Sequence, residues 1–245
     1  MAQNWHKGIV IRIDHESATT RRFYIQVPEM EELNFKPGQF VTLDLPIHEK
    51  INKRWRSYSI ASWPDGSNVF ELVIVYLENG AGTTYLFNDV KVGSELIFRG
   101  PLGVFTLPDT IERNLFFICT GTGIAPFRSM VNHINRHNIP HKNIYLVFGC
   151  RLLCDGLYGD EMRALEKEMP SFHYLPTYSR EAAGPGVISG YVHQVYENIC
   201  NDRQLAASQD ADFYLCGWKN MIDEAKQRIL AMGFERKRIH QELYG

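Results

Sequence analysis

Residues 115–134 read LFFICTGTGIAPFRSMVNHI, and this stretch decides the fold of the second half of the chain. Leu115–Cys119 is a short, wholly apolar run, as expected of a fully buried strand. The glycines that follow predict a tight turn, and Pro126 suits the first turn of a helix, where its missing N–H costs nothing. One helix face is then marked, at spacings of three and four residues, by Phe127, Met130, Val131 and Ile134. The stretch therefore predicts strand, turn and helix in succession.

The same alternation recurs toward the C-terminus. Strand-like runs at 144–148, 172–177 and 212–216 are each followed by apolar residues at helical spacing, and a last short strand is expected at about 239–243. Strands that alternate with helices build a doubly wound parallel sheet. The C-terminal part is therefore predicted to be an α/β doubly wound parallel-sheet domain.

The N-terminal part has a different pattern. Short runs rich in β-branched and aromatic residues, separated by turn signals, lie at 8–13, 21–27, 39–45, 69–77 and 95–99. Many short strands with little helix indicate an antiparallel β-barrel or sandwich. Because the pattern changes near 108–112, two domains are predicted, with boundaries 1–109 and 110–245.

Composition and charge argue against nucleic-acid-binding, membrane-spanning and metal-binding proteins. The net charge of −2 and the pI near 6.5 give no sign of nucleic-acid binding. No apolar run approaches the roughly 20 residues of a membrane span, and the first residues have no signal-peptide pattern, so a cytoplasmic protein is expected. A monomer is expected as well. The five cysteines are scattered without the spacing of a metal cluster or a disulfide framework, so no metal centre is predicted.

Three candidate ligand positions follow strands of the predicted parallel sheet. Glycines in Thr120–Pro126 would let a pyrophosphate approach the backbone at a helix N-terminus, although a tight turn without a ligand accounts for them equally well. The hydroxyl of Ser179 beside the guanidinium of Arg180 suits a phosphate monoester, such as the 2′-phosphate of NADPH; a solvated polar loop is the alternative. The third position is Cys216-Gly217, where a buried cysteine is most often a small hydrophobic residue.

The predicted barrel contributes the segment RSYSIAS at 56–62. On a regular strand, Arg56 and Tyr58 point to one face and Ser59 to the other, so they meet one ligand only if the strand end twists or bulges. An edge strand with one arginine is the other interpretation.

Together these segments resemble the ferredoxin–NADP reductase family over nearly the whole chain. The resemblance rests on six motifs: Arg56-x-Tyr58-Ser59, Gly80–Leu86, Gly100–Gly103, Thr120–Pro126, Cys216-Gly217 and Glu242-x-Tyr244. One extra residue, Gly245, follows the tyrosine at which the family's chains end.

The resemblance implies a role for each motif. In the flavin site, Arg56 binds the pyrophosphate, Tyr58 covers one face of the ring, and Ser59 lies near flavin N5. Tyr244 covers the other face. Further FAD contacts are implied for Ile60, Ala81, Gly82 and Thr83. The nucleotide residues implied are Thr120, Gly121, Gly123, Arg151, Ser179, Arg180, Cys216 and Gly217, with Ser179 and Arg180 at the 2′-phosphate. Catalytic roles are implied for Ser59, Cys216, Glu242 and Tyr244.

The activity implied is electron transfer, by way of FAD, between NADPH and a separate one-electron carrier such as ferredoxin, flavodoxin or a haem protein. The sequence leaves FMN open in place of FAD, and NADH in place of NADPH. Two other functions stay open: an NADH-preferring reductase that supplies an oxygenase or cytochrome, and a flavin electron-transfer subunit of a larger assembly that takes no nicotinamide itself.

Overall fold

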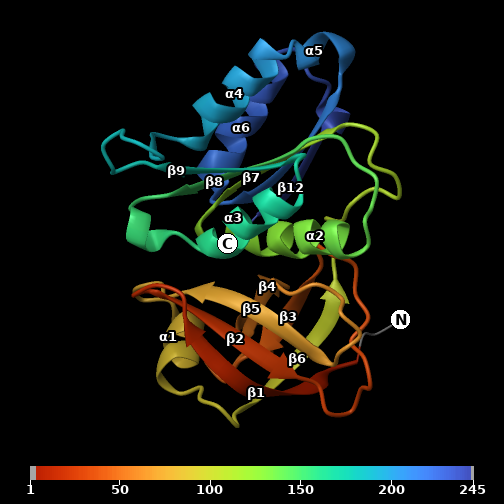
Figure 1. Cartoon of the computed structure of the whole chain (residues 1–245). Coiled ribbons are helices and arrows are strands. Elements are labelled where there is room, and N and C mark those ends of the chain that lie inside the picture. Colours follow the sequence, from red (N-terminus) through yellow and green to blue (C-terminus); the bar gives the residue numbers. More distant parts are fainter. Residues whose placement is uncertain (1–3, 244–245) are drawn as a thin grey trace. The chain divides into compact units, whose positions relative to one another are not determined.

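The computed structural model describes residues 4–243, which form two compact units (Figure 1). By their contacts, the residues up to Thr106 and Ala125–His133 belong to the first unit. Leu107–Ile124 and the residues from Ile134 onward belong to the second. Each unit has its own sheet and its own hydrophobic core.

The first unit contains a six-stranded antiparallel sheet in the order β4-β3-β6-β1-β2-β5. Its strands are β1 (His6–His15), β2 (Thr20–Gln26), β3 (Phe40–Asp44), β4 (Trp55–Ser59), β5 (Val69–Val75) and β6 (Glu95–Leu102). A short 3-10 helix, η1 (Ile51–Lys53), precedes β4, and helix α1 (Ala81–Asn88) follows β5. Just beyond β4, the Ala61 N–H donates to Glu71 O at 2.8 Å, so the two outer strands also meet.

Alternating side chains of these strands fill one core. Phe23 and Ile25 of β2 pack with Phe70 and Leu72 of β5, and Phe98 of β6 lies among them, all fully buried. These are the inward positions that the period of two predicts. The antiparallel first domain is therefore confirmed.

The second unit contains a six-stranded sheet in the order β10-β9-β8-β7-β11-β12, with every pair parallel. Its strands are β7 (Asn114–Thr120), β8 (Ile144–Cys150), β9 (Phe172–Tyr178), β10 (Ile188–Ser189), β11 (Ala211–Gly217) and β12 (Ile239–Leu243). The chain builds outward from β7 through β8 and β9, then returns to place β11 on the other side of β7. Ligands of doubly wound sheets bind where this order reverses, outside the carboxyl ends of the strands.

Helices cover both faces of this sheet (Figure 1). On one face, α4 (Val192–Asp202) and α6 (Lys219–Ala231) bury Tyr196 and Ile222 against Phe116 and Phe213. On the other face lies α3 (Gly159–Glu168), which contacts β9. Shorter helices are α5 (Leu205–Ser208) and the 3-10 turns η2 (Gly121–Gly123), η3 (Leu153–Asp155) and η4 (Arg236–Arg238). The predicted parallel-sheet domain is thus also confirmed.

Helix α2 (Ile124–Arg136) begins where the sequence predicts, but it is buried on more than one face. Besides the apolar stripe, the polar residues Arg128, Ser129 and Asn132 are buried, with exposed fractions of 6%, 0% and 7%. A helix with one buried stripe would leave such residues in water. The burial of Arg128 therefore requires an explanation from its partners.

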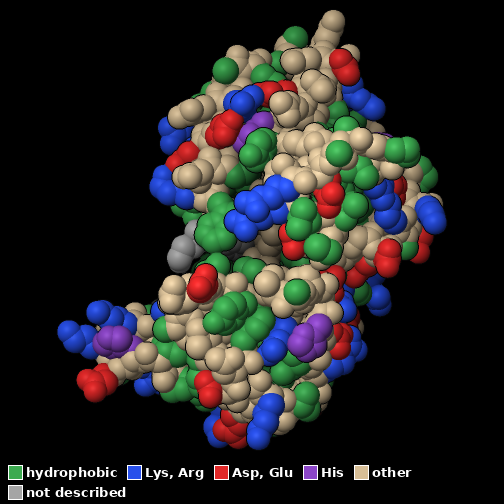
Figure 2. Space-filling view, turned by 90° about the vertical axis from the view of Figure 1, so that its left-hand side faces the viewer, with side chains coloured by type: hydrophobic (Ala, Val, Ile, Leu, Met, Phe, Trp, Pro, Cys, Tyr) green, Lys and Arg blue, Asp and Glu red, His purple; other side chains and the backbone are tan. Residues whose placement is uncertain are grey.

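No helix within residues 4–243 is both long and apolar enough to cross a membrane. In the same described range, no three His, Cys, Asp or Glu side chains are grouped to hold a metal ion, and all five cysteines are free. Acidic and basic side chains are interspersed over the face seen in Figure 2, in keeping with the net charge of −2.

Candidate functional site

Arg56 of β4 lies across the first turn of α1. A Cβ added to Gly82 would come within 3.0 Å of Arg56 Cγ and 3.2 Å of its Nε, so a larger residue would have to push the Arg56 side chain aside. Arg56 Nη1 donates to the carbonyls of Lys53 (3.1 Å) and Trp55 (2.8 Å), which orient the guanidinium. Within the described chain no carboxylate pairs with it. A guanidinium beside the free N–H groups of a helix start forms an anion site that suits a pyrophosphate.

In the first turn of α1, Ala81 is exposed, whereas the Thr83 side chain is hydrogen-bonded within its own loop. Ala81 is exposed, with its backbone open to a ligand. The Thr83 hydroxyl is engaged inside the turn, because it accepts from Leu77 N–H at 3.1 Å and lies 3.1 Å from Gly80 O. The Thr83 hydroxyl therefore holds the loop before the helix in shape, and only its backbone N–H, in the first helical turn, is left for a ligand.

Strand β4 ends at Ser59, and the predicted flavin residues differ sharply in exposure there. Tyr58 is half-buried, and burial raises the pKa of its phenol to about 12, against the opposing effect of Arg56. A neutral ring of this kind suits stacking. Ser59 is 6% exposed, whereas Ile60 is fully buried in the core. Any contact of Ile60 with a ligand must therefore come from its backbone.

The turn after β7 and the end of β11 are packed tightly together. A Cβ on Gly123 would lie 2.3 Å from Cys216 O, and one on Gly217, which has φ +149°, would lie 2.5 Å from Thr120 Oγ1. Gly121 has φ +53°, a left-handed conformation that glycine adopts without strain. The glycines that the sequence marks in this loop are therefore needed to bring the two strand ends into contact.

One polar atom in this loop has no partner. Thr120 Oγ1 is buried and makes no hydrogen bond within residues 4–243. A buried hydroxyl without a partner costs free energy, so its presence fits a ligand that supplies one. Together with the η2 and α2 backbone N–H groups, it fits a pyridine nucleotide at the carboxyl edge of the sheet.

Cys216 and Glu242 are brought side by side by parallel pairing. Cys216 is paired in register with Cys119 of β7 on one side and with Glu242 of β12 on the other. Cys216 is fully buried, and Glu242 is half-buried. Cys216 therefore contributes to the buried packing beneath the end of β11, and its side chain is not exposed at the surface. Tyr244 and Gly245 lie outside the described residues.

Arg151 and Arg180 belong to two loops that hold each other. Ser179 N–H donates to Cys150 O at 3.0 Å, and Arg180 N–H donates to Arg151 O at 2.9 Å. Both guanidiniums are exposed, and neither has a carboxylate partner in the described part of the chain. The neighbouring Glu181 instead accepts from Leu153 N–H at 2.9 Å. Two arginines without a carboxylate partner, on loops bonded to each other next to Ser179, are residue types that suit a phosphate monoester.

Sequence reasoning missed Tyr191, which stands beside this pair of loops. Its side chain is 69% exposed, and the preceding Gly190 N–H donates to Tyr178 O at 3.1 Å. An exposed ring beside the predicted Ser179 and Arg180 position is a surface on which a planar base could stack. In the sequence, Tyr191 is marked only as an aromatic residue that precedes a predicted helix in a polar segment. Such residues are too common for the pattern to indicate a ligand contact.

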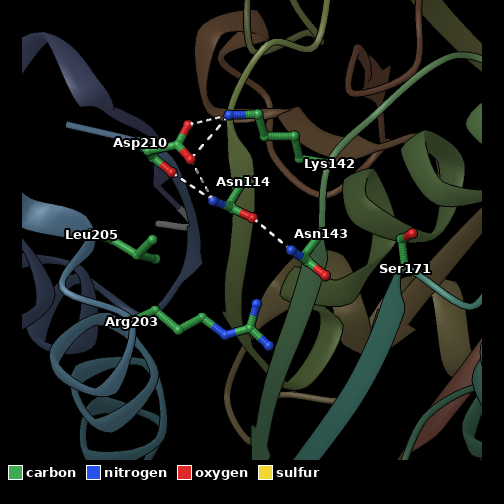
Figure 3. Close-up of a pocket in the computed structure, with 7 residues that line it drawn as sticks. All are labelled: Asn114, Lys142, Asn143, Ser171, Arg203, Leu205 and Asp210. Carbon is green, nitrogen blue, oxygen red and sulfur yellow. Dashed lines mark hydrogen bonds and ion pairs between the residues drawn. The ribbon is translucent and has the colours of Figure 1, made fainter. Parts of the chain in front are cut away.

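The pocket drawn in Figure 3 lies at the opposite edge of the parallel sheet, where the strands begin. It has a volume of about 510 Å³ and is lined by Asn114, Lys142, Asn143, Ser171, Arg203, Leu205 and Asp210. Most of its polar groups bond to one another. Lys142 Nζ lies 2.8 Å from Asp210 Oδ1, Asn114 donates to Asp210 O, and Asn143 donates to Asn114. None of the predicted site residues lines this pocket, and its polar network joins the strand starts.

Comparison with known proteins agrees with this arrangement. Residues 7–107 match the family described as "Oxidoreductase FAD-binding domain", and residues 117–227 match "Oxidoreductase NAD-binding domain". The ferredoxin–NADP reductase B of Sorangium cellulosum is 33% identical over 217 residues, which are 86% of this chain and 85% of that protein. The anthranilate 1,2-dioxygenase electron transfer component of Acinetobacter baylyi is 31% identical over 220 residues, 89% of this chain but only 61% of that protein.

Solved structures share the fold. A ferredoxin NADP+ reductase from Neisseria gonorrhoeae with bound FAD and NADP has a TM-score of 0.80 at 24% identity, with 98% of each chain covered. The Amycolatopsis cytochrome P450 reductase GcoB has a TM-score of 0.85 at 24% identity, covering 99% of this chain and 71% of that one. The chain therefore belongs to the ferredoxin–NADP reductase family and is a flavoenzyme of the oxidoreductase class.

Proposed function

We propose that the chain transfers electrons between NADPH and a separate one-electron carrier, using FAD bound to the first unit. NADPH gives up its electrons as a hydride, and bound FAD supplies the chemistry that accepts this pair and releases electrons singly. Names of relatives agree on electron transfer but differ in the acceptor, which is ferredoxin for one and an oxygenase for another.

The observation that carries the choice of NADPH is the pair of exposed guanidiniums at Arg151 and Arg180 beside Ser179. Each lacks a carboxylate within residues 4–243, and their loops are bonded to each other through the backbone. The 2′-phosphate is the only group that separates NADPH from NADH. Charge-assisted hydrogen bonds from arginine to phosphate are among the strongest available to a protein, so this site favours NADPH.

In the flavin site, each residue has one task. Arg56 and the N–H groups at the start of α1 bind the pyrophosphate, and the Tyr58 ring covers one face of the isoalloxazine. Ser59 donates a hydrogen bond near N5, and Glu242 holds the proton that accompanies reduction. Tyr244, which lies outside the described residues, would cover the other ring face when no nicotinamide is bound there. Cys216 excludes water from the nicotinamide side.

Rapid mixing of the FAD-loaded protein with each nucleotide under anaerobic conditions tests the proposal. NADPH is expected to bleach the flavin absorbance at least tenfold faster than NADH at equal, subsaturating concentration. A preference for NADH would instead support a reductase that supplies an oxygenase. A flavin that neither nucleotide bleaches would support an electron-transfer subunit without nicotinamide chemistry.

The acceptor is tested separately with the reduced protein. A one-electron acceptor, such as a plant-type ferredoxin or cytochrome c, is expected to be reduced in a 2:1 ratio to NADPH consumed. Transfer only to a two-electron acceptor, with no reduction of either carrier, would contradict the proposed conversion.

A further inference from the structure

Arg128 of helix α2 is a buried arginine in the same unit as the flavin segment. Its side chain is 7% exposed, and its Nη1 lies 2.9 Å from Glu71 Oε2 on β5, whose own side chain is 4% exposed. The guanidinium also lies over the Trp63 ring, 5.2 Å from its centroid. Glu71 is separated from Arg128 by 57 positions in the sequence, so the pair exists only in the folded chain.

The same Nη1 donates to Ala61 O at 2.9 Å. The other side of this peptide is also held, because Ala61 N–H donates to Glu71 O at 2.8 Å. Glu71 N–H in turn donates to Ser62 Oγ at 3.0 Å. Arg128 and Glu71 therefore fix both backbone groups of Ala61, just after the end of β4.

We propose that Arg128, anchored by Glu71, is a positioning residue for the flavin site. Ala61 is two residues beyond Ser59, and Ile60 between them is locked by its buried side chain and by its N–H bond to Gln39 O. With Ala61 held at both its N–H and its C=O, the backbone at Ser59 has little freedom. The inference rests on the proposed binding of flavin at Arg56, Tyr58 and Ser59.

Stability alone does not account for this pair. Replacing a buried ion pair by apolar residues of similar size is often neutral or stabilising, because the charges no longer lose their hydration. Apolar residues cannot, however, donate to Ala61 O, which is buried and needs a partner. The bond to the backbone is therefore what the arginine adds, and the carboxylate of Glu71 makes the buried charge tolerable.

The test compares the wild type with the double variant Arg128→Met and Glu71→Met, which removes both charges together. The FAD dissociation constant is measured by fluorescence titration, thermal unfolding is followed without FAD, and the visible spectrum of bound FAD is recorded. The apo protein is expected to unfold at a somewhat lower temperature than the wild type, because buried Ala61 O loses its donor, but to remain folded. FAD affinity should fall by up to about tenfold, because the loosened backbone at Ser59 must be ordered again when FAD binds. The resolved shoulders of the flavin band should also be lost.

Arg22→Met is the matched control, because Arg22 pairs with Glu16 (2.9 Å) and Asp14 (3.5 Å) in the same unit, away from β4. It is expected to leave FAD affinity and spectrum unchanged.

A double variant with wild-type affinity and spectrum would overturn the positioning role. If the double variant does not fold, Arg128→Lys keeps the charge, but its nitrogen ends one bond short of the position of Nη1, from which both acceptors are bonded. Wild-type FAD affinity and spectrum in that variant would likewise overturn the inference. If the wild-type chain binds no FAD, the proposed function itself is refuted. The titration of the wild type, which comes first, therefore distinguishes this outcome from a failure of the positioning role.

Discussion

Arg180 tests the proposed 2′-phosphate site at the scale of one residue. Replacing it by alanine removes one of the two arginines proposed at this site, neither of which has a carboxylate partner among residues 4–243. Hydrogen bonds to charged groups contribute about 1.5–3 kcal/mol, so the KM for NADPH should rise about 10- to 100-fold, with little change for NADH. Steady-state kinetics with both nucleotides measures this. Arg163→Ala is the control, because Arg163 already pairs with Glu166 at 2.9 Å. Equal effects of Arg180→Ala on the two nucleotides would remove this residue from the site.

Gly123 tests the contact between the two strand ends. A methyl group there would lie 2.3 Å from Cys216 O, a backbone atom that has no room to move away. Gly123→Ala is therefore expected to destabilise the chain by about 1–3 kcal/mol and to weaken NADP+ binding. Gly159→Ala, at the start of α3 with nothing within 4 Å of the added Cβ, is the control and should be neutral or stabilising. Denaturant unfolding and nucleotide titration measure both effects. Equal stabilities of the two variants would show that the loop adapts.

A site residue could be predicted from the sequence when its role depends on its immediate neighbours in the chain. It could not be predicted when the role depends on residues that are distant in the sequence. The glycines at 121 and 123 follow from the turn between a strand and a helix, and the structure gives the reason for each. The engagement of the Thr83 hydroxyl within its own loop could not be foreseen, since it depends on the shape of 77–80. The same holds for Arg128, whose partners Glu71 and Ala61 are far away in the sequence.

At the scale of elements, apolar periodicity was sufficient for the long strands and helices. The predicted strand at 144–148 is β8, and the last short strand is β12 with the predicted bounds 239–243. The two-residue strand β10 was not predicted, because it is exposed and held by its pairing with β9. Helix α2 was predicted with one buried face, but tertiary contacts bury its polar side as well. Pattern analysis detects a core face, and a second covered face leaves no such signal.

One buried and one half-buried histidine give the stability of the second unit a dependence on pH. Burial lowers the pKa of His193 on α4, although Glu224 opposes the shift, and burial also lowers the pKa of His240 on β12. In the unfolded chain these residues titrate near pH 6.5. Below that pH the unfolded state binds more protons than the folded one, so stability is lost as pH falls from about 7 toward 5. Urea unfolding at several pH values is expected to show this fall. His193→Gln should reduce the slope, and His15→Gln, on an exposed position of β1, should not. An unchanged slope in His193→Gln would mean that other groups cause the loss.

At the scale of the whole molecule, the two separate cores predict that the two ligands act on different parts of the chain. A ligand at 100 times its Kd stabilises the folded state it binds by about 2.7 kcal/mol. For units of this size, that corresponds to a rise in Tm of roughly 5–10 °C. FAD is expected to raise the transition in which the first unit melts, and NADP+ the one in which the second unit melts. Calorimetry with each ligand alone, and hydrogen exchange to assign the transitions, measure this. Arg56→Ala should abolish the FAD shift and keep the NADP+ shift, whereas Arg180→Ala should reduce the NADP+ shift and keep the FAD shift. If FAD protected only amides of the parallel sheet, flavin binding at β4 and α1 would be refuted.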